Sequence, residues 1–253
     1  MKQIAVGAAP FAPRHPRRAL HVTDKLPSMV VRAVVFDVGE TLLDETRAWS
    51  DWADYFRIPR LTFMAGLGAV LARGGEYRDL FELFRPGIDL AATVQSRVDA
   101  GEELELTEAD LYPDVRPAMS ALLEAGYRLA VVGNQPVRTE NIFNGLEFPF
   151  DFVASSDGWG VAKPDPRFFE RVASSFDLPA AEVAYVGDRV DNDVRPAAAA
   201  GLCSIFIRRG PWGWIQAGRE DPPEAALTIN ALTELPEKLA ALDRQTERAT
   251  SAR

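Results

Sequence analysis

The stretch "VVFDVGETLLDE", residues 34–45, joins an apolar run to an aspartate that is followed closely by a glycine. The run covers Ala33 to Phe36, with Val31 upstream, and a short apolar run of this kind predicts a buried strand. Asp37 ends this strand, where a carboxylate loses hydration at a cost unless it has a partner or a function. Capping of the next turn or helix is the ordinary explanation for Asp37. The stretch therefore raises the question of what Asp37 does, and why Gly39 stands two residues after it.

The composition argues against several classes of function. The chain has 253 residues, of which 47% are hydrophobic, enough for a buried core. A net charge of −9 argues against nucleic acid or an anionic membrane as a partner, and no apolar run approaches the roughly 18 residues that cross a bilayer. The two histidines, His15 and His21, lie near the N-terminus, which disfavours a Ser-His-Asp triad or a histidine-rich zinc site. Cys203 is the single cysteine, which suits a reducing, cytoplasmic location.

The apolar pattern divides the chain into several parts. Residues 1–28 are rich in proline and arginine, so we expect a disordered N-terminal extension, with an organellar transit peptide as the less favoured alternative. Residues 29–44 and 111–245 alternate strands with helices, which predicts an α/β core: a Rossmann-like, doubly wound parallel sheet covered on both faces. Residues 45–110 space apolar side chains three and four apart and predict a small helical cap domain. Residues 246–253 are expected to form a polar tail.

Several polar side chains follow the strands expected in the core, namely residues 33–36, 128–134, 150–156, 182–188 and 203–209. Ligands of open parallel sheets bind beyond the carboxyl ends of the strands. Near that edge we expect Asp37, Thr41, Gly133, Asn134, Lys163, Asp188 and Asp193. These residue types suit phosphoryl transfer: a carboxylate attacks phosphorus, a lysine neutralises the developing charge, and further carboxylates hold Mg²⁺.

Four segments resemble the sequence motifs of the haloacid dehalogenase-like (HAD) hydrolase superfamily, in the subgroup with a helical cap inserted after the first motif. They are "FDVGETL", "VVGNQ", "VAKPDPRFF" and "YVGDRVDNDVRPAAAAGL". The resemblance covers residues from about 30 to 243. It implies a Mg²⁺-dependent hydrolase, and for this chain a phosphatase that acts on a small phosphorylated metabolite through an aspartyl-phosphate intermediate.

The resemblance also implies roles for individual residues. Asp37 would be the nucleophile, and Lys163 would bridge Asp37 and the phosphate. Mg²⁺ would be held by Asp37, the backbone carbonyl of Gly39, Asp188 and Asp193. The phosphate oxygens would be held by a set of residues around the strand ends: Thr41, Gly133, Asn134 and Lys163. Asp191 is expected to cap a helix rather than to bind the metal.

The chain departs from the family pattern at two positions. In HAD phosphatases a second aspartate, two residues after the nucleophile, protonates the leaving group and later activates water; here that residue is Gly39. Glu40 is one residue further on and is expected to point elsewhere. Gly133 lacks a hydroxyl that would bind phosphate. We therefore expect a weakened acid/base step, since general acid catalysis contributes about 10² to 10⁴-fold.

Two alternatives remain beside the phosphatase. A catalytically reduced member would bind a phosphorylated ligand or a partner protein, although retention of Asp37, Lys163 and Asp188 argues against complete loss of activity. A 2-haloacid dehalogenase needs no metal and does not keep the "GD" pattern of Asp188, so it is the lesser alternative. Phosphonate-cleaving relatives use a cap lysine, and residues 45–112 contain none.

Two groups of side chains bear on partners. The cap arginines are candidates for contact with a second anionic group of the substrate: Arg47, Arg57, Arg60, Arg73, Arg78 and Arg85. Trp212 and Trp214 follow the last expected strand. For these tryptophans we favour simple packing over covering of the site or pairing with another subunit in a homodimer.

Overall fold

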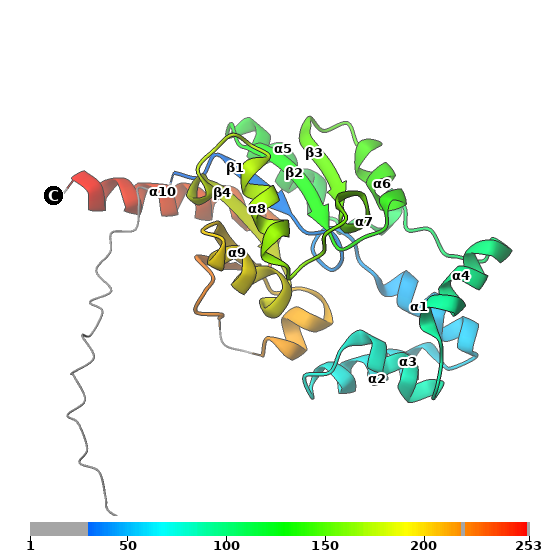
Figure 1. Ribbon diagram of the computed structural model, residues 1–253. Helices are drawn as coiled ribbons and strands as arrows, with labels where there is room; N and C mark the ends of the chain where they lie inside the picture. Colours follow the sequence, from blue (N-terminus) through cyan, green and yellow to red (C-terminus); the bar gives the residue numbers. More distant parts are fainter. Residues whose placement is uncertain (1–29, 219–220, 252–253) are drawn as a thin grey trace, which may run out of the picture.

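The fold is built on a six-stranded sheet. The computed structural model describes residues 30–218 and 221–251. All strands are parallel and lie in the order β3-β2-β1-β4-β5-β6 (Figure 1). Their bounds are β1 Ala33–Phe36, β2 Arg128–Gly133, β3 Phe150–Ser155, β4 Val183–Gly187, β5 Cys203–Ile207 and β6 Leu227–Ile229. The predicted α/β class, a Rossmann-like parallel sheet, is confirmed, and the five expected strands are present. The short edge strand β6 was not predicted.

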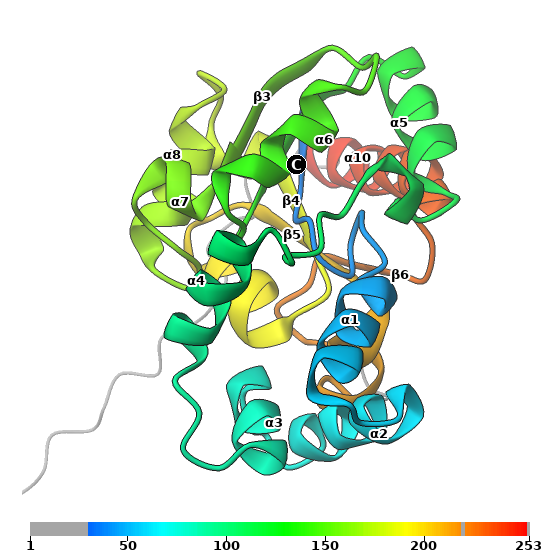
Figure 2. The same cartoon turned by 90° about the vertical axis from the view of Figure 1, so that its right-hand side faces the viewer.

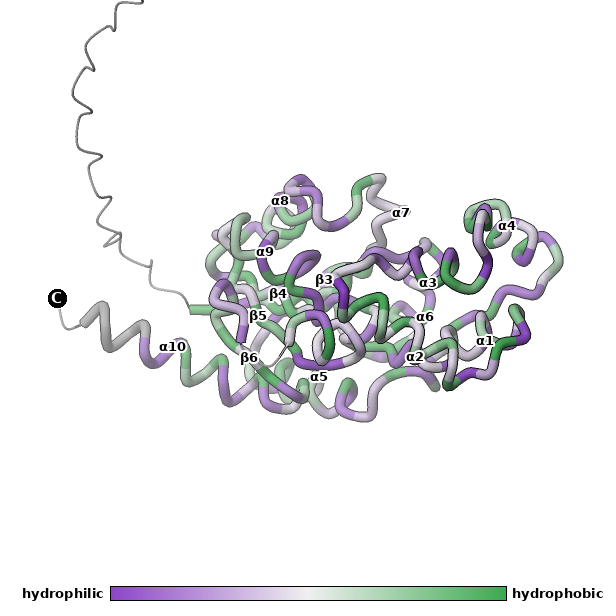
Figure 3. The backbone as a smooth tube through the Cα atoms, turned by 90° about the horizontal axis from the view of Figure 1, so that it is seen from below, coloured by the Kyte–Doolittle hydropathy of each residue, from purple (hydrophilic) through white to green (hydrophobic). Residues whose placement is uncertain are grey.

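Helices cover both faces of the sheet, because successive residues of β1 point to opposite sides. Val34 and Phe36 belong to one apolar cluster, which includes residues of α5 (Val115–Glu124) and α10 (Leu235–Ser251). Ala33 and Val35 belong to the other, which includes residues of α8 (Pro166–Ser174) and α9 (Arg195–Ala199). In Figure 3, hydrophilic and hydrophobic residues alternate along α10, as expected of a helix that packs by one face. Burial on both faces explains the continuous apolar run in the sequence of β1.

Four helices lie between β1 and the rest of the core: α1 Thr46–Phe56, α2 Arg60–Leu71, α3 Tyr77–Phe84 and α4 Leu90–Ala100. They correspond to the helices expected in the cap, and α1, α2 and α3 lie side by side beyond the sheet (Figure 2). Aromatic side chains form their core, with Trp52 and Phe81 at 4.9 Å between ring centroids. The boundaries of cap and core at residues 44 and 111 stay a prediction.

The remaining helical segments are short. They are α6 Glu140–Asn144, α7 Ser156–Trp159, two π-helical turns at Val190–Val194 and Trp212–Gln216, and several single 3₁₀ turns. Helix α10 continues to Ser251, so most of the expected polar tail, residues 246–253, is helical. Its alanine, glutamate and arginine are good helix formers and extend a helix already docked on the core. The expected N-terminal extension, residues 1–28, lies outside the described residues.

No helix within residues 30–218 or 221–251 has the length and apolar character required to cross a membrane.

Strand order fixes the place of the site. The chain starts the sheet at β1, adds β2 and β3 on one side, and then crosses to β4 on the other. The loops after β1 and β4 therefore diverge, and a crevice opens between them at the carboxyl ends of the strands. Asp37 follows β1 at this point, and its backbone N–H donates to the carbonyl of Val186 in β4 at 2.9 Å.

Candidate active site

Lys163 lies between two carboxylates at the carboxyl edge of the sheet. Its Nζ is 2.5 Å from Asp37 Oδ1 and 2.6 Å from Asp193 Oδ1. All three residues are buried, with exposed fractions of 5%, 6% and 0% for Lys163, Asp37 and Asp193. Burial alone would lower the pKa of Lys163, but the charges of Asp193 and Asp37 outweigh it and raise that pKa well above its ordinary value. Lys163 is therefore a fixed cation beside the Asp37 carboxylate.

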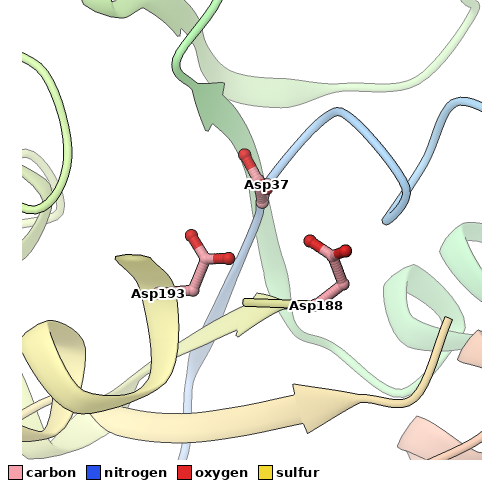
Figure 4. A group of neighbouring side chains, drawn as sticks. All are labelled: Asp37, Asp188 and Asp193. Carbon is pink, nitrogen blue, oxygen red and sulfur yellow. The ribbon is translucent and has the colours of Figure 1, made fainter. Parts of the chain in front are cut away.

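Three aspartates form a cluster at the same edge. One carboxylate oxygen from each of Asp37, Asp188 and Asp193 lies within 4.8 Å of the others (Figure 4). Burial, together with the charges of Asp193 and Asp37, raises the pKa of Asp188 well above its ordinary value. Burial also raises the pKa of Asp193 to about 6, although Lys163 opposes this. Three buried carboxylates with one lysine leave negative charge uncompensated.

The donor set fits a divalent cation. Oδ2 of Asp188, a member of this cluster, is buried and makes no hydrogen bond to any described residue, so its lone pairs are unused. Oxygen ligands from carboxylates are those that Mg²⁺ prefers. Gly39, whose carbonyl was expected to be a ligand, lines the same cavity as Asp37 and Asp188. Magnesium binding remains a proposal for these residues.

We expect Mg²⁺ to raise the melting temperature, because it binds the folded cluster and not the unfolded chain. At one hundred times its Kd, binding adds about 2.7 kcal/mol, a shift on the order of 5 °C or more for a chain of this size. Asp188→Asn should abolish the shift, and Asp99→Asn, a matched change on the exposed end of α4, should not. A melting temperature that changes with neither Mg²⁺ nor EDTA would contradict the metal site.

The predicted phosphate ligands are placed less uniformly. Asn134 lines the cavity, but its side chain is engaged by the backbone of Lys163: Nδ2 donates to the carbonyl at 2.9 Å and Oδ1 accepts from the N–H at 2.8 Å. Thr41 is completely buried, and its hydroxyl has no hydrogen-bond partner among the described residues. A Cβ on Gly133 would lie 2.5 Å from Asp37 Oδ1, so this glycine leaves room for that carboxylate. Asn134 therefore holds Lys163 in place in this structure.

Asp191 does not act as the expected cap. The residue at the N-cap of the turn Val190–Val194 is Arg189, and no side chain caps it. Instead Asp191 is exposed, and its Oδ2 accepts a hydrogen bond from the Arg189 guanidinium at 2.8 Å. The π-helical geometry of the turn, which brings the buried Asp193 back over Arg189, explains the difference.

A cavity of about 750 Å³ is lined by Asp37 and Asp188. Its walls come from both the core and the cap, with Arg78 and Trp49 on the cap side. Of the cap arginines, Arg47 and Arg60 are paired with acidic residues elsewhere, whereas the exposed Arg78 lines this cavity. Trp212 is buried and packs against Trp49 at 6.2 Å between ring centroids, which agrees with the packing interpretation, although it also lines this cavity. Trp214 is 61% exposed, so the packing interpretation is wrong for that residue.

Sequence reasoning missed Glu45. This residue lines the cavity beside Gly39, half-buried, at the N-cap of α1. Burial raises the pKa of Glu45 to about 8, helped by the charges of Glu40 and Asp37 and opposed by Gln135 and Trp49. An acidic residue at the start of the predicted helical cap was the available signal, but acidic residues are ordinary at helix starts.

Fold and site together define a hydrolase with an aspartate cluster at the carboxyl edge of a parallel sheet. The model of the haloacid dehalogenase-like hydrolase family matches residues 31–201, and the chain belongs to this family. The chain is 30% identical over 217 residues to a glyceraldehyde 3-phosphate phosphatase of Methanopyrus kandleri, covering 76% of this chain and 90% of the relative. It is also 32% identical to a phosphoserine phosphatase of Thermus thermophilus, covering 64% of each chain.

Solved structures share the fold. The HAD hydrolase YfnB of Bacillus subtilis, described as bound to magnesium, has a TM-score of 0.58 at 20% identity and covers 83% of this chain and 98% of its own. A dehalogenase solved as an intermediate complex has a TM-score of 0.57 at 21% identity, covering 83% of this chain and 98% of its own. Because metal-bound and dehalogenase structures resemble this chain equally, the fold does not distinguish their chemistries.

Proposed function

We propose that this protein is a Mg²⁺-dependent phosphatase that acts on a small phosphorylated metabolite through an aspartyl-phosphate intermediate. The observation that carries the proposal is the position of Lys163, with Nζ at 2.5 Å from Asp37 Oδ1 and 2.6 Å from Asp193 Oδ1. This ion pair holds the Asp37 carboxylate in place where it lines the cavity. The lysine also places a positive charge where a phosphate would approach.

Each residue has a defined task in this proposal. Asp37 attacks phosphorus and becomes phosphorylated, and Lys163 stabilises the negative charge on the phosphoryl oxygens. Asn134 positions Lys163 through its two hydrogen bonds to the lysine backbone. A cation held by Asp37, the Gly39 carbonyl, Asp188 and Asp193 would neutralise phosphate charge and hold it in line for attack.

The relatives support a small substrate. Those with at least 30% identity include phosphatases named for glyceraldehyde 3-phosphate and for phosphoserine. Arg78 lies on the cap side of the cavity and would contact a polar or anionic group at the far end of the substrate. We therefore propose a short phosphate monoester whose other end carries a carbonyl or carboxylate oxygen.

A substrate panel tests this function. Purified protein is assayed with glyceraldehyde 3-phosphate, phosphoserine, glycerol phosphate and p-nitrophenyl phosphate, each with Mg²⁺ or with EDTA. We expect phosphate release that requires Mg²⁺ and is fastest for one of the short metabolites. EDTA-insensitive release of chloride from 2-chloropropionate would instead identify a dehalogenase. Tight binding of a phosphate ester without any turnover would favour the catalytically reduced alternative.

A further inference from the structure

The carboxyl group of Glu45 occupies the space beside Gly39. A Cβ built on Gly39 would lie 2.5 Å from Glu45 Oε1 and 3.0 Å from its Cδ. Gly39 and Glu45 line the same cavity as Asp37. A carboxyl group is therefore present where the first side-chain atoms of residue 39 would be, although it comes from a residue six positions later.

The turn after β1 places Glu45 next to Gly39. The carbonyl of Val38 accepts from the N–H groups of Leu42 and Leu43 at 2.8 and 2.9 Å, and Glu40 N–H donates to the carbonyl of Leu43 at 2.8 Å. The chain thus folds over itself between residues 38 and 43. Glu45 then starts α1 from a point next to Gly39, so the position of its carboxyl group follows from the backbone.

We propose that Glu45 donates the proton to the leaving group, replacing the aspartate that related phosphatases carry at position 39. This assignment rests on the proposed phosphatase function. The carboxyl group is half-buried and faces the cavity, so it is within reach of a substrate whose phosphorus lies on Asp37. Gln135 Nε2 lies 3.4 Å from the same Cβ point, which places an amide beside the Glu45 carboxyl group.

Glu40, the other carboxylate of this loop, is held in a different direction. Its backbone has a φ of 53°, a left-handed conformation, and its side chain is buried although Glu40 lines the same cavity. Oε2 accepts from the hydroxyl of Tyr112 at 2.6 Å, and a Cβ on Gly210 would lie 2.5 Å from this same oxygen. Oε1 accepts from the N–H of Glu45 at 3.2 Å. Glu40 is therefore a positioning residue that fixes the start of α1.

The proposed reaction has two steps, the formation and the hydrolysis of the aspartyl-phosphate. As an Asp37 oxygen bonds to phosphorus, the bond from phosphorus to the ester oxygen breaks, and the Glu45 carboxylic acid gives its proton to that oxygen to release the alcohol. Glu45, now a carboxylate, then takes a proton from a water molecule while the oxygen of that water attacks the phosphorus of the aspartyl-phosphate. The bond to Asp37 breaks, which releases inorganic phosphate and leaves Glu45 protonated again.

The test compares two leaving groups in Glu45→Gln. p-Nitrophenolate needs little protonation, whereas the alkoxide of glycerol phosphate needs a proton donor. We expect turnover of glycerol phosphate to fall about a hundredfold or more and turnover of p-nitrophenyl phosphate to fall less than tenfold. Gly39→Ala, which retains Glu45 but adds a Cβ against its carboxyl group, should show the same selective loss. Glu147→Gln, an exposed control between α6 and β3, should change neither rate.

Moving the carboxyl group gives the stricter test. In the double variant Gly39→Asp with Glu45→Ala, residue 39 gains a carboxyl group and the space it needs. Turnover of glycerol phosphate should recover at least tenfold over Glu45→Gln. Equal losses on both esters in a folded Glu45→Gln, or no loss on either, would overturn the role of Glu45 while leaving the phosphatase intact. A wild type that releases phosphate from no ester of the substrate panel would overturn the proposed function itself.

Discussion

Asp37→Asn is expected to abolish hydrolysis of every phosphate ester, by at least about a thousandfold, while the protein stays folded. An amide cannot form the acyl phosphate, and no leaving group avoids that requirement. The loss should therefore be equal for p-nitrophenyl phosphate and for an alkyl phosphate. This pattern differs from that of Glu45→Gln, for which turnover of the alkyl phosphate should fall much more than turnover of p-nitrophenyl phosphate.

The intermediate itself provides the measurement. Wild-type protein quenched in acid during turnover of a radiolabelled ester should carry label that hydroxylamine removes, as expected of an acyl phosphate. Asp37→Asn should carry none, and Asp99→Asn, on the exposed end of α4, should behave as the wild type. Label that persists in Asp37→Asn, or release of phosphate at more than a few per cent of the wild-type rate, would contradict Asp37 as the nucleophile.

Most of the sheet was predictable because its strands are buried on both faces. Runs such as residues 33–36 and 183–187 are continuously apolar and fully buried, so their sequences differ plainly from the helices around them. Edge strand β6 is different. Its three residues pair only with β5, and its extended conformation depends on that exposed edge more than on its own sequence. The same holds for the end of α10, where helix propagation from a docked segment overrides a polar composition.

The site was predictable where strand ends determine it. Asp37, Lys163 and Asp193 come together because the carboxyl ends of parallel strands share one edge, a rule that needs no knowledge of side-chain geometry. Asn134 lines the cavity, as expected, but its side chain forms its hydrogen bonds with the backbone of Lys163. Which partner an amide finds depends on distances of a few tenths of an ångström, and no sequence pattern gives these.

Glu45 shows a second reason why part of the site could not be predicted from the sequence. Two residues on adjacent turns of the chain become neighbours only when the loop between them closes on itself, as it does around the carbonyl of Val38. When Gly39 is compared with the aspartate that related phosphatases have at the same position of the motif, the sequence shows only that a carboxylate is missing. The space beside Gly39 contains a carboxyl group all the same.

Lys163→Met is expected to destabilise the metal-free protein by about 3–5 kcal/mol, because it leaves buried carboxylates without their cation. Asp37 and Asp193 are 6% and 0% exposed, so water cannot replace the lysine. Lys238→Met is the matched control: its Nζ lies 2.8 Å from Glu234 Oε2, but its side chain is 39% exposed, and such pairs contribute about 0–1 kcal/mol. Urea unfolding at pH 8 with EDTA measures both differences.

The pH dependence of this deficit follows from the carboxylates. Burial already raises the pKa of Asp193 to about 6 with Lys163 present, and removal of the positive charge must raise it further. A carboxyl group whose folded pKa lies above its unfolded value costs stability as pH rises through that interval and none below it. The deficit of Lys163→Met should therefore shrink between pH 8 and pH 5, whereas that of Lys238→Met stays small throughout. A deficit below about 1 kcal/mol at pH 8, or one that grows as pH falls, would show that Lys163 does not neutralise the cluster, because an unpaired buried carboxylate costs more than this.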